Sequence, residues 1–272
     1  MDLTISSSHF QYPELLEELL ESDTAYFRAA AECEQVQGFQ ISHMPGLETL
    51  AAACVVHRIS KQDNGDLAQC LQAVEQRILA LACHHARFYQ QYPDDELEDW
   101  FRKNGYRPAR EIALLNTYDA PGFHKPNDSS IQLRPVRTEH DWTLKLSLHQ
   151  EIQNGPDGHA SRAEKWLEME RKKCDAGYME PFLIFREDMA CGAVNYAPGP
   201  RLGRLKNIVI HPRWRRNDLG AQAARLIARI ARERGMTAAG CFALEDGQAL
   251  NMYKKAGYAP AILQTEWYKC LK

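Results

Sequence analysis

The sequence lacks any apolar run long enough to cross a membrane. One of the longest, Leu50–Val56, spans seven residues, whereas a membrane helix needs about 20. Basic charge is not in excess either, because 33 Lys and Arg face 36 Asp and Glu, for a net charge of −3. This balance argues against a nucleic-acid partner, which needs a strongly basic surface. Met1-Asp2-Leu3 opens no positively charged, apolar leader, so we expect a cytoplasmic protein with no membrane partner.

Paired cysteines are missing as well. The eight cysteines stand singly, without a Cys-x-x-Cys pair, which is typical of reduced thiols used as small core residues. The adjacent histidines His84 and His85 would point to opposite faces of a strand, so they are poorly placed to share a metal. We therefore predict that the protein has no metal site.

A linker is predicted at residues 119–130, which read DAPGFHKPNDSS. Pro, Gly and short polar residues fill most of this stretch, and that composition is typical of a loop. The chain has 272 residues, of which 44% are apolar, so it is long enough for two domains that each bury a core. We therefore expect one domain at residues 1–118 and a second at residues 131–272.

An internal repeat relates these two domains. Residues 99–109 (DWFRKNGYRPA) and 251–261 (NMYKKAGYAPA) are identical at five of eleven positions. Upstream, Val56-His57 and Ile210-His211 stand at nearly the same offset, and each precedes a polar turn and a segment with helical spacing. The pattern predicts a duplication with small insertions. The alternative is that residues 1–118 form an unrelated helical domain.

The second half has a readable order of strands and helices. Apolar residues that alternate or run together predict strands, and apolar residues three and four apart predict helices. The expected strands are 131–136, 182–185, 190–196, 205–210, 238–244 and 262–270. The expected helical regions are 141–177, a helix that starts at residue 219 and is closed by Gly235, and 248–256. This order indicates an α+β fold with one mixed sheet flanked by helices.

Residues 208–222, IVIHPRWRRNDLGAQ, bring together the end of a strand, a basic turn and the start of a helix. The first N–H groups of a helix have no intrahelical partner and carry partial positive charge, so they can bind a phosphate. Arg213, Arg215 and Arg216 add full positive charges. Neither Gly-Lys-Ser/Thr nor Gly-x-Gly-x-x-Gly follows, which excludes a nucleotide P-loop and a dinucleotide-binding fingerprint.

This stretch resembles the pyrophosphate loop of the GNAT superfamily of CoA-dependent N-acyltransferases, which runs Arg/Gln-x-x-Gly-x-Gly/Ala. Arg215 matches the first position of the loop, and Gly220 matches its second glycine. Asp218 stands in place of the first glycine. Its carboxylate must either point away and cap the helix or weaken the binding of a diphosphate.

A second segment strengthens the resemblance. Residues 246–258 are similar to the superfamily's Asn-x-x-Ala-x-x-Leu-Tyr-x-x-x-Gly-Phe, with Ala249, Tyr253 and Gly257 in place and Asp246 where Asn is usual. The resemblance covers residues 131–272 well and residues 36–118 weakly, through the repeat. It implies a GNAT-like mixed sheet flanked by helices, in two tandem copies.

The resemblance implies an N-acetyltransferase that moves an acetyl group from acetyl-CoA to a primary amine, which we expect to be a small molecule. The residues implied for donor binding lie at the strand end, in the loop and after the next strand: Ile208, Val209, Ile210, Arg215, Arg216, Asn217, Asp218, Leu219, Gly220, Ala221 and Asp246. Tyr253 is implied as the general acid, because a phenol with a pKa near 10 is protonated at neutral pH and can donate to a thiolate.

The general base is not evident from the sequence. Many members of the superfamily carry a Glu on the strand before the loop, yet Leu202–Pro212 contains no carboxylate. His211 is a candidate, but a histidine at the end of a strand is more typically a solvated side chain. Glu187 and Asp188 fall in a turn, where surface charges are common.

Two other functions fit the same residues. Asp218 and the missing base leave open a non-catalytic acyl-CoA-binding protein. Tandem folds of this kind also include aminoacyl-tRNA-dependent transferases, although the near-neutral charge argues against a tRNA reader. No pattern in the sequence sets the oligomeric state.

The first half is expected to be a degenerate copy that binds no CoA. Its turn, Arg58–Asp66, carries Asp63 and Asp66 where a diphosphate would need hydrogen-bond donors. The position that matches Tyr253 is Phe101, which has no proton to give.

Overall fold

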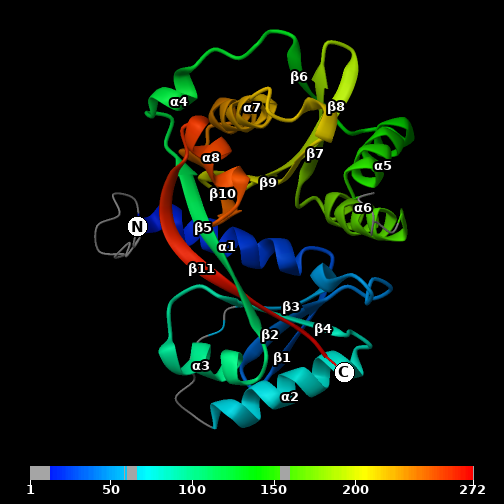
Figure 1. Ribbon diagram of the computed structural model, residues 1–272, viewed down its shortest axis with the longest axis vertical. Coiled ribbons are helices and arrows are strands. Elements are labelled where there is room, and N and C mark those ends of the chain that lie inside the picture. The colour runs from blue at the N-terminus through cyan, green and yellow to red at the C-terminus, as the bar shows by residue number, and fades with distance from the viewer. Residues whose placement is uncertain (1–12, 58, 60–65, 154–159, 272) are drawn as a thin grey trace. The chain divides into compact units, whose positions relative to one another are not determined.

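The computed structural model describes residues 13–57, 59, 66–153 and 160–271 (Figure 1). Most of the first-half turn discussed above, including Arg58 and Asp63, therefore lies outside the described residues. The chain forms two compact units. Unit 1 contains residues 1–22 and 112–262, and unit 2 contains residues 23–111 and 263–272. In the described part of the chain, no helix is long and apolar enough to span a membrane.

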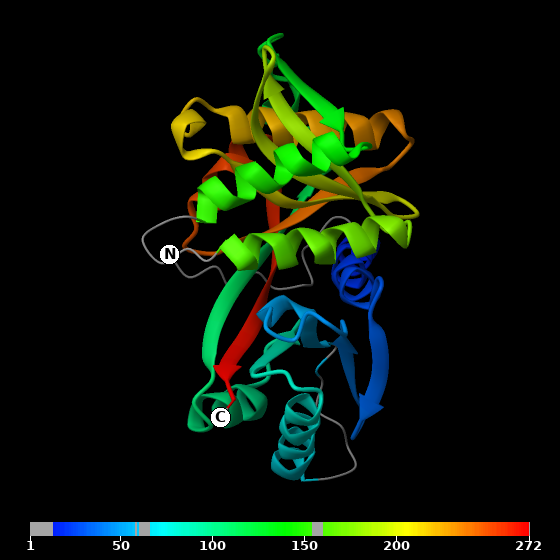
Figure 2. The same ribbon diagram turned by 90° about the vertical axis from the view of Figure 1, so that its right-hand side faces the viewer.

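Unit 1 is a mixed sheet covered by helices on both faces. Its strands are β6 (Ile131–Pro135), β7 (Glu180–Arg186), β8 (Met189–Pro198), β9 (Leu202–Ile210), β10 (Ala238–Leu244), the second part of β5 (Arg107–Asn116) and the first part of β11 (Ala259–Cys270). Its helices are the first part of α1 (Pro13–Arg28), α4 (Pro121–His124), α5 (Glu139–Gln153), α6 (Ala160–Asp175), η3 (Pro212–Trp214), α7 (Leu219–Glu233) and α8 (Gln248–Lys255). Figures 1 and 2 show α5 and α6 on one face of β7, β8 and β9, and α7 on the other.

Unit 2 is built from shorter elements. Its strands are β1 (Glu32–Val36), β2 (Phe39–His43), β3 (Cys54–His57), β4 (His85–Gln90), the first part of β5 and the last part of β11. Its helices are the end of α1, η2 (Ala51–Ala53), α2 (Leu67–Ala80) and α3 (Asp95–Lys103).

The two units repeat the same order of elements. In unit 1 the antiparallel strands β7, β8 and β9 are followed by α7, by β10 parallel to β9, and then by α8 and β11. In unit 2 the antiparallel strands β1, β2 and β3 are followed by α2, by β4 parallel to β3, and then by α3 and β5. This common order agrees with the predicted duplication and differs from the alternative of a helical first domain.

Each half of the sequence contributes a strand to the sheet built mainly by the other half. The strand order is β1-β2-β3-β4-β11-β5-β10-β9-β8-β7-β6. In unit 1, β5 therefore lies between β10 and β11, and in unit 2, β11 lies between β4 and β5. For this reason the compact units do not divide at residues 119–130, where the domain boundary was expected. Composition marks a loop, but it carries no information about which strands will pair.

Residues 119–130 are packed against the helices of unit 1 and are not a free linker. The Arg225 guanidinium of α7 donates to Asn127 Oδ1 (2.9 Å), and Gln222 Oε1 accepts from the Asp128 amide (2.7 Å). The side chain of Phe123 is buried. A Cβ atom at Gly122 would lie 2.7 Å from Gly257 N, so the segment touches the end of α8 closely. Gly122, one of the residues that suggested a linker here, permits this close approach because it has no Cβ atom.

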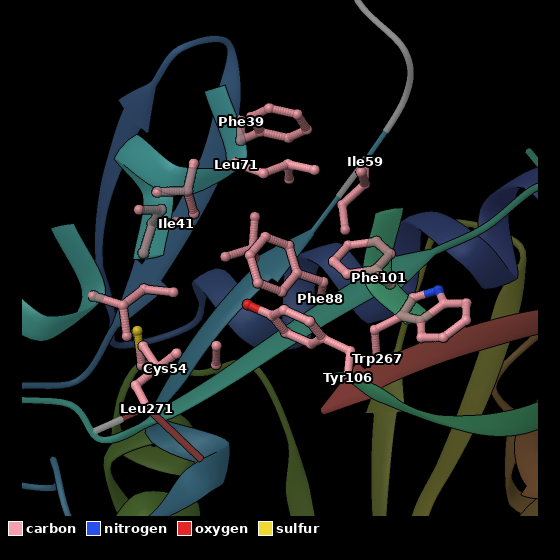
Figure 3. Close-up of a cluster of buried hydrophobic side chains, with 14 of the residues drawn as sticks. Phe39, Ile41, Cys54, Ile59, Leu71, Phe88, Phe101, Tyr106, Trp267 and Leu271 are labelled. Atoms are coloured by element: carbon pink, nitrogen blue, oxygen red, sulfur yellow. The ribbon is translucent and has the colours of Figure 1, made fainter. Parts of the chain in front are cut away.

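The cores follow the apolar spacing of the sequence. Unit 2 is centred on aromatic residues, which Figure 3 shows together: Trp267 stacks on Phe101 with ring centroids 5.1 Å apart, and Phe88 contacts both Phe101 and Tyr106. In unit 1, the apolar face of α1, including Leu19 and Leu20, packs on the sheet. Aromatic contacts of this kind add to the free energy gained by burying apolar area.

The end of α8 offers a test of how residues 119–130 pack. Gly257 has a φ angle of +94°, and a Cβ atom there would lie 2.6 Å from Phe123 N. Gly235 at the end of α7 has a φ angle of +82°, but nothing lies within 4 Å of its added Cβ. We expect Gly235→Ala to lower the free energy of unfolding by about 1 kcal/mol, from the backbone conformation alone. Gly257→Ala should cost about 3 kcal/mol or more, because the backbone at Phe123 must also move. Equal losses of stability in urea titrations would contradict this packing.

Candidate functional site

The strands β9 and β10 separate before β9 ends. Among the described residues, they pair in parallel only over Leu202–Arg204 and Ala238–Gly240, although β9 continues to Ile210. The side chains of β9 change along the same path, from buried at residues 202–205 to half-buried at residues 206–210. Within the described part of β10, no residue pairs with Ile208–Ile210 of β9, so the main-chain groups of these three residues on that side need hydrogen-bond partners other than β10.

A cleft of about 670 Å³ opens where the two strands separate. It is lined by the end of β9, by the turn and first residues of α7, by one face of α8 and by one residue of α5: Ile208, Val209, Ile210, Trp214, Arg215, Arg216, Asp218, Leu219, Gly220, Ala221, Gln248, Ala249, Asn251, Met252, Lys255 and Ile152. All of these residues belong to unit 1.

The N-terminus of α7 points its free amides toward this cleft. The Gln222 amide donates to Asp218 O (3.0 Å), so the amides of Leu219, Gly220 and Ala221 precede the first such bond of the helix. Asp218 makes no side-chain cap and sits in the left-handed region, with a φ angle of +58°. One of the two expected roles of Asp218, capping of the helix by its carboxylate, is therefore wrong. The left-handed backbone does not place the carboxylate on these amides. Uncapped amides and the helix dipole favour an anion here.

Basic side chains surround the same helix end. Arg215 Nε donates to the main-chain oxygen of Ile210 (3.0 Å), which fastens the turn to β9. Arg216 is exposed and lines the cleft. Lys255 Nζ lies 3.6 Å from Asp218 Oδ1, so the carboxylate is at least partly balanced by a cation within the site.

Most residues expected for donor binding line this cleft. Asn217 and Asp246 do not; both are exposed. Sequence reasoning missed the contribution of α8, whose residues Gln248, Ala249, Met252 and Lys255 face the cleft. These residues are separated by one, three and three positions, a spacing that places them on one face of a helix. This spacing is the sequence signal that could have identified them as lining residues. A Cβ atom at Gly220 would lie 2.2 Å from Met252 Sδ, so a side chain at this position would require the Met252 side chain to move.

Tyr253 follows Met252 on α8, and the structure buries it. Its side chain is 4% exposed, packs edge-on against Tyr258, and is not part of the cleft lining. Burial, with Cys241 close by, raises the pKa of Tyr253 well above its ordinary value. The phenol is therefore protonated at neutral pH, but it lies behind the wall of the cleft.

The histidine at the end of β9 has both ring nitrogens engaged. His211 Nδ1 accepts from the Arg213 amide (3.2 Å), and Nε2 lies 2.5 Å from Glu151 Oε2. This arrangement leaves no open nitrogen to accept a proton from an amine, which argues against His211 as the base. The turn at Glu187 and Asp188 is on the surface, where Asp188 pairs with Arg134 (3.3 Å).

A buried polar cluster lies on the side of β9 that faces α5 and α6. Glu170 of α6 is fully buried, and its Oε2 lies 2.6 Å from Lys145 Nζ of α5. Burial by itself raises the pKa of Glu170, but Lys145 and then His149 more than offset this, so that pKa lies below its usual range. Burial lowers the pKa of His149, which favours the neutral imidazole. No residue of this cluster was predicted from the sequence.

The corresponding positions in unit 2 are closed. Asp66 caps α2, accepting from the amides of Ala68 (2.9 Å) and Gln69 (3.4 Å). Phe101 on α3 is fully buried against Trp267. The helix end that would face a phosphate is thus satisfied by the protein itself.

Comparison with known proteins gives one family. Residues 146–258 match the model of the Acetyltransferase (GNAT) family. No curated protein sequence matches the chain. The fold is similar to that of a conserved protein of unknown function from Staphylococcus epidermidis ATCC 12228, with a TM-score of 0.69 and 13% identity over 98% of this chain and 100% of that one.

Two further solved structures share the fold. A GCN5-related N-acetyltransferase from Kribbella flavida has a TM-score of 0.67 and 12% identity, covering 92% of this chain and 94% of that one. A tandem GNAT protein from the clavulanic acid biosynthesis pathway has a TM-score of 0.57 and 10% identity, covering 85% of this chain and 78% of that one. These likenesses agree with the predicted mixed sheet in two tandem copies.

The family match covers the elements that build the cleft. It begins within α5 and runs through α6, the separating strand β9 and the N-terminus of α7, and it ends just after α8. Both sequence signatures, the loop before α7 and the segment on α8, lie inside it. Residues 146–258 therefore form an acetyltransferase domain of the GNAT family, and this domain makes the protein an acyltransferase.

Proposed function

We propose that the protein transfers an acetyl group from acetyl-CoA to the primary amine of a small molecule. The observation that carries this proposal is the uncapped N-terminus of α7, which faces the cleft formed where β9 leaves β10. A helix end of this kind suits a diphosphate, and a strand edge without a partner suits the amide-containing arm of CoA. The match to the GNAT family supports acetyl-CoA as the donor and a small amine as the acceptor.

Each part of the cleft has a role in this proposal. The amides of Leu219, Gly220 and Ala221 receive the diphosphate, with Arg216 and Lys255 as counter-charges. The end of β9, Ile208–Ile210, lies along the thioester arm. Transfer forms a C–N bond between the acceptor nitrogen and the thioester carbonyl carbon. The C–S bond breaks, the nitrogen gives up a proton, and the thiolate takes one.

Tyr253 remains our proposal for the proton donor to the thiolate. Its phenol is protonated at neutral pH, and it lies on the helix that lines the cleft. The burial of Tyr253 also favours a second candidate function, a non-catalytic acyl-CoA-binding protein, as do Asp218 and the absence of an evident base. Turnover separates the two functions, because only the enzyme releases free CoA when an amine is present.

We propose that unit 2 is a degenerate copy of the fold that binds no CoA. Its closed helix end at Asp66 and the buried Phe101 both support this proposal. The shared order of elements supports an origin by duplication.

Calorimetric titration with CoA should give one site per chain. At about 100 times the Kd, the ligand should raise the free energy of unfolding by about 2.7 kcal/mol. Arg216→Glu should weaken binding by about tenfold or more, because it replaces a counter-charge by a repulsive group. Arg213→Glu is the matched control: it makes the same charge change in the same turn, but its residue does not line the cleft. Equal effects of the two variants would contradict the site, and a second CoA site would contradict the role of unit 2.

Removing the charge of Asp218 should tighten CoA binding by a few-fold. Asp218 holds a φ angle of +58°, which Gly and Asn tolerate well. Both Asp218→Gly and Asp218→Asn should therefore fold, and both remove a carboxylate from the diphosphate site. Measured Kd values should also rise less steeply with added salt in the wild type than in the variants, because Asp218 offsets part of the attraction that salt screens. Weaker binding in both variants would instead mean that Asp218 holds Lys255 in place for the ligand.

Tyr253→Phe should leave the Kd for CoA within a few-fold and lower turnover by about 10²-fold. The substitution keeps the ring and its contact with Tyr258, and it removes only the hydroxyl. Release of free CoA from acetyl-CoA, followed with a thiol reagent over a panel of primary amines, measures the effect. Unchanged turnover would mean that another group protonates the thiolate.

A further inference from the structure

The strand that forms the floor of the cleft contains a residue in an unusual backbone conformation. Asn207, in the middle of β9, has a φ angle of +54°. The register between β8 and β9 shifts at the same place, between the pairs Ala193–Val209 and Asn195–Lys206. Asn207 therefore forms a bulge, and Ile208, the next residue, is the first residue of β9 to line the cleft. Bulges of this kind re-aim the strand that follows them.

Asn tolerates a left-handed conformation better than other residues with a side chain, but inside a strand the conformation interrupts the ladder, so contacts from the surroundings are needed to fix it there. Asn207 receives this support from α6, because its Nδ2 donates to Glu170 Oε1 (2.9 Å). The same carboxylate oxygen accepts from Asn195 Nδ2 of β8 (2.7 Å) and from Trp166 Nε1 (3.1 Å). One carboxylate thus ties together both strands on either side of the register shift.

Lys145 completes the arrangement from α5. Its Nζ lies 2.6 Å from Glu170 Oε2 and donates to Asn195 Oδ1 (2.8 Å). Lys145 and Glu170 are at most 1% exposed. A buried ion pair is expensive in desolvation, and apolar residues of similar volume often stabilise a fold as well or better. Stability alone therefore does not account for a pair at this position.

We propose that Glu170, held in place by Lys145, is a positioning residue that fixes the bulge at Asn207 and so aims Ile208–Ile210 at the acyl donor. The proposal rests on the proposed function of the cleft. Glu170 does not line the cleft, and it acts through the backbone of β9. In this proposal the Glu170–Lys145 pair fixes the direction of β9 after the bulge. That direction in turn determines where the main-chain groups of Ile208–Ile210 lie relative to the acyl donor.

Two substitutions of Asn207 separate this role from simple packing. Asn207→Gly removes the side-chain anchor but adopts a positive φ angle freely, so the bulge should persist without Glu170. Asn207→Val removes the same anchor with a β-branched residue that avoids this conformation, so the bulge should flatten. We expect the Kd for CoA, from calorimetry, to stay within about threefold in the Gly variant and to rise about tenfold or more in the Val variant. Equal affinities in the two folded variants would overturn the proposal.

A double-mutant cycle then tests Glu170 itself. Glu170→Gln combined with Lys145→Met removes both charges together and leaves no buried charge unpaired. In the wild-type background this pair of changes should weaken CoA binding by about tenfold or more. In the Asn207→Gly background it should change the Kd by less than about threefold, because the bulge no longer depends on the anchor. A purely structural role would instead lower Tm in both backgrounds and leave the Kd unchanged in both.

The outcomes distinguish the two proposals. If the wild-type chain does not bind CoA, the proposed function fails and this inference fails with it. If the wild type binds CoA and the affinity is the same in every folded variant, only the inference fails. Should the double variant not fold, the comparison between Asn207→Gly and Asn207→Val still decides.

Discussion

The separation of β9 from β10 is the constraint on which the rest of the structure depends. A strand that leaves its neighbour exposes main-chain groups that must be paired by something else. Arg215 donates a hydrogen bond to the main-chain oxygen of Ile210. The residues at the end of the strand, Ile208–Ile210, line the cleft. Around this opening lie the bulge at Asn207, the buried ion pair behind it, the N-terminus of α7 and one face of α8.

The sequence predicted the parts of this arrangement that depend on neighbouring residues. The strand end, basic turn and helix start at residues 208–222 were readable because each has a local signature. The fold class followed from the order in which apolar residues with strand spacing and with helix spacing occur along the chain. The face of α8 was readable in principle from the spacing of Gln248, Ala249, Met252 and Lys255, but nothing local indicated which face would meet α7.

The parts that depend on distant partners were not predictable. Glu170 precedes Asn207 by 37 residues, and neither residue is unusual in its local context. Asp218 was expected either to cap the helix or to weaken the binding of a diphosphate. Its left-handed backbone excludes the capping role, and the sequence gives no strong signal for that backbone conformation. The domain boundary expected at residues 119–130 differs from the division into compact units for a related reason. The composition of a loop does not indicate which strands pair across it. Tyr253 had the spacing relative to Gly257 that the family segment requires. Its burial could not be predicted, because it depends on packing against residues distant in the sequence.

The exchange of β5 and β11 has a consequence for how the chain reaches its native state. Unit 2 is completed by residues 263–272, so during synthesis the first 111 residues cannot finish their sheet until nearly the whole chain has left the ribosome. Pairings between segments this far apart in sequence are slow to form, and unpaired strand edges are exposed meanwhile. Neither half is a separable module, since cutting the chain between them would remove a central strand from both sheets. Each unit thus needs a strand from the other half of the sequence to complete its sheet.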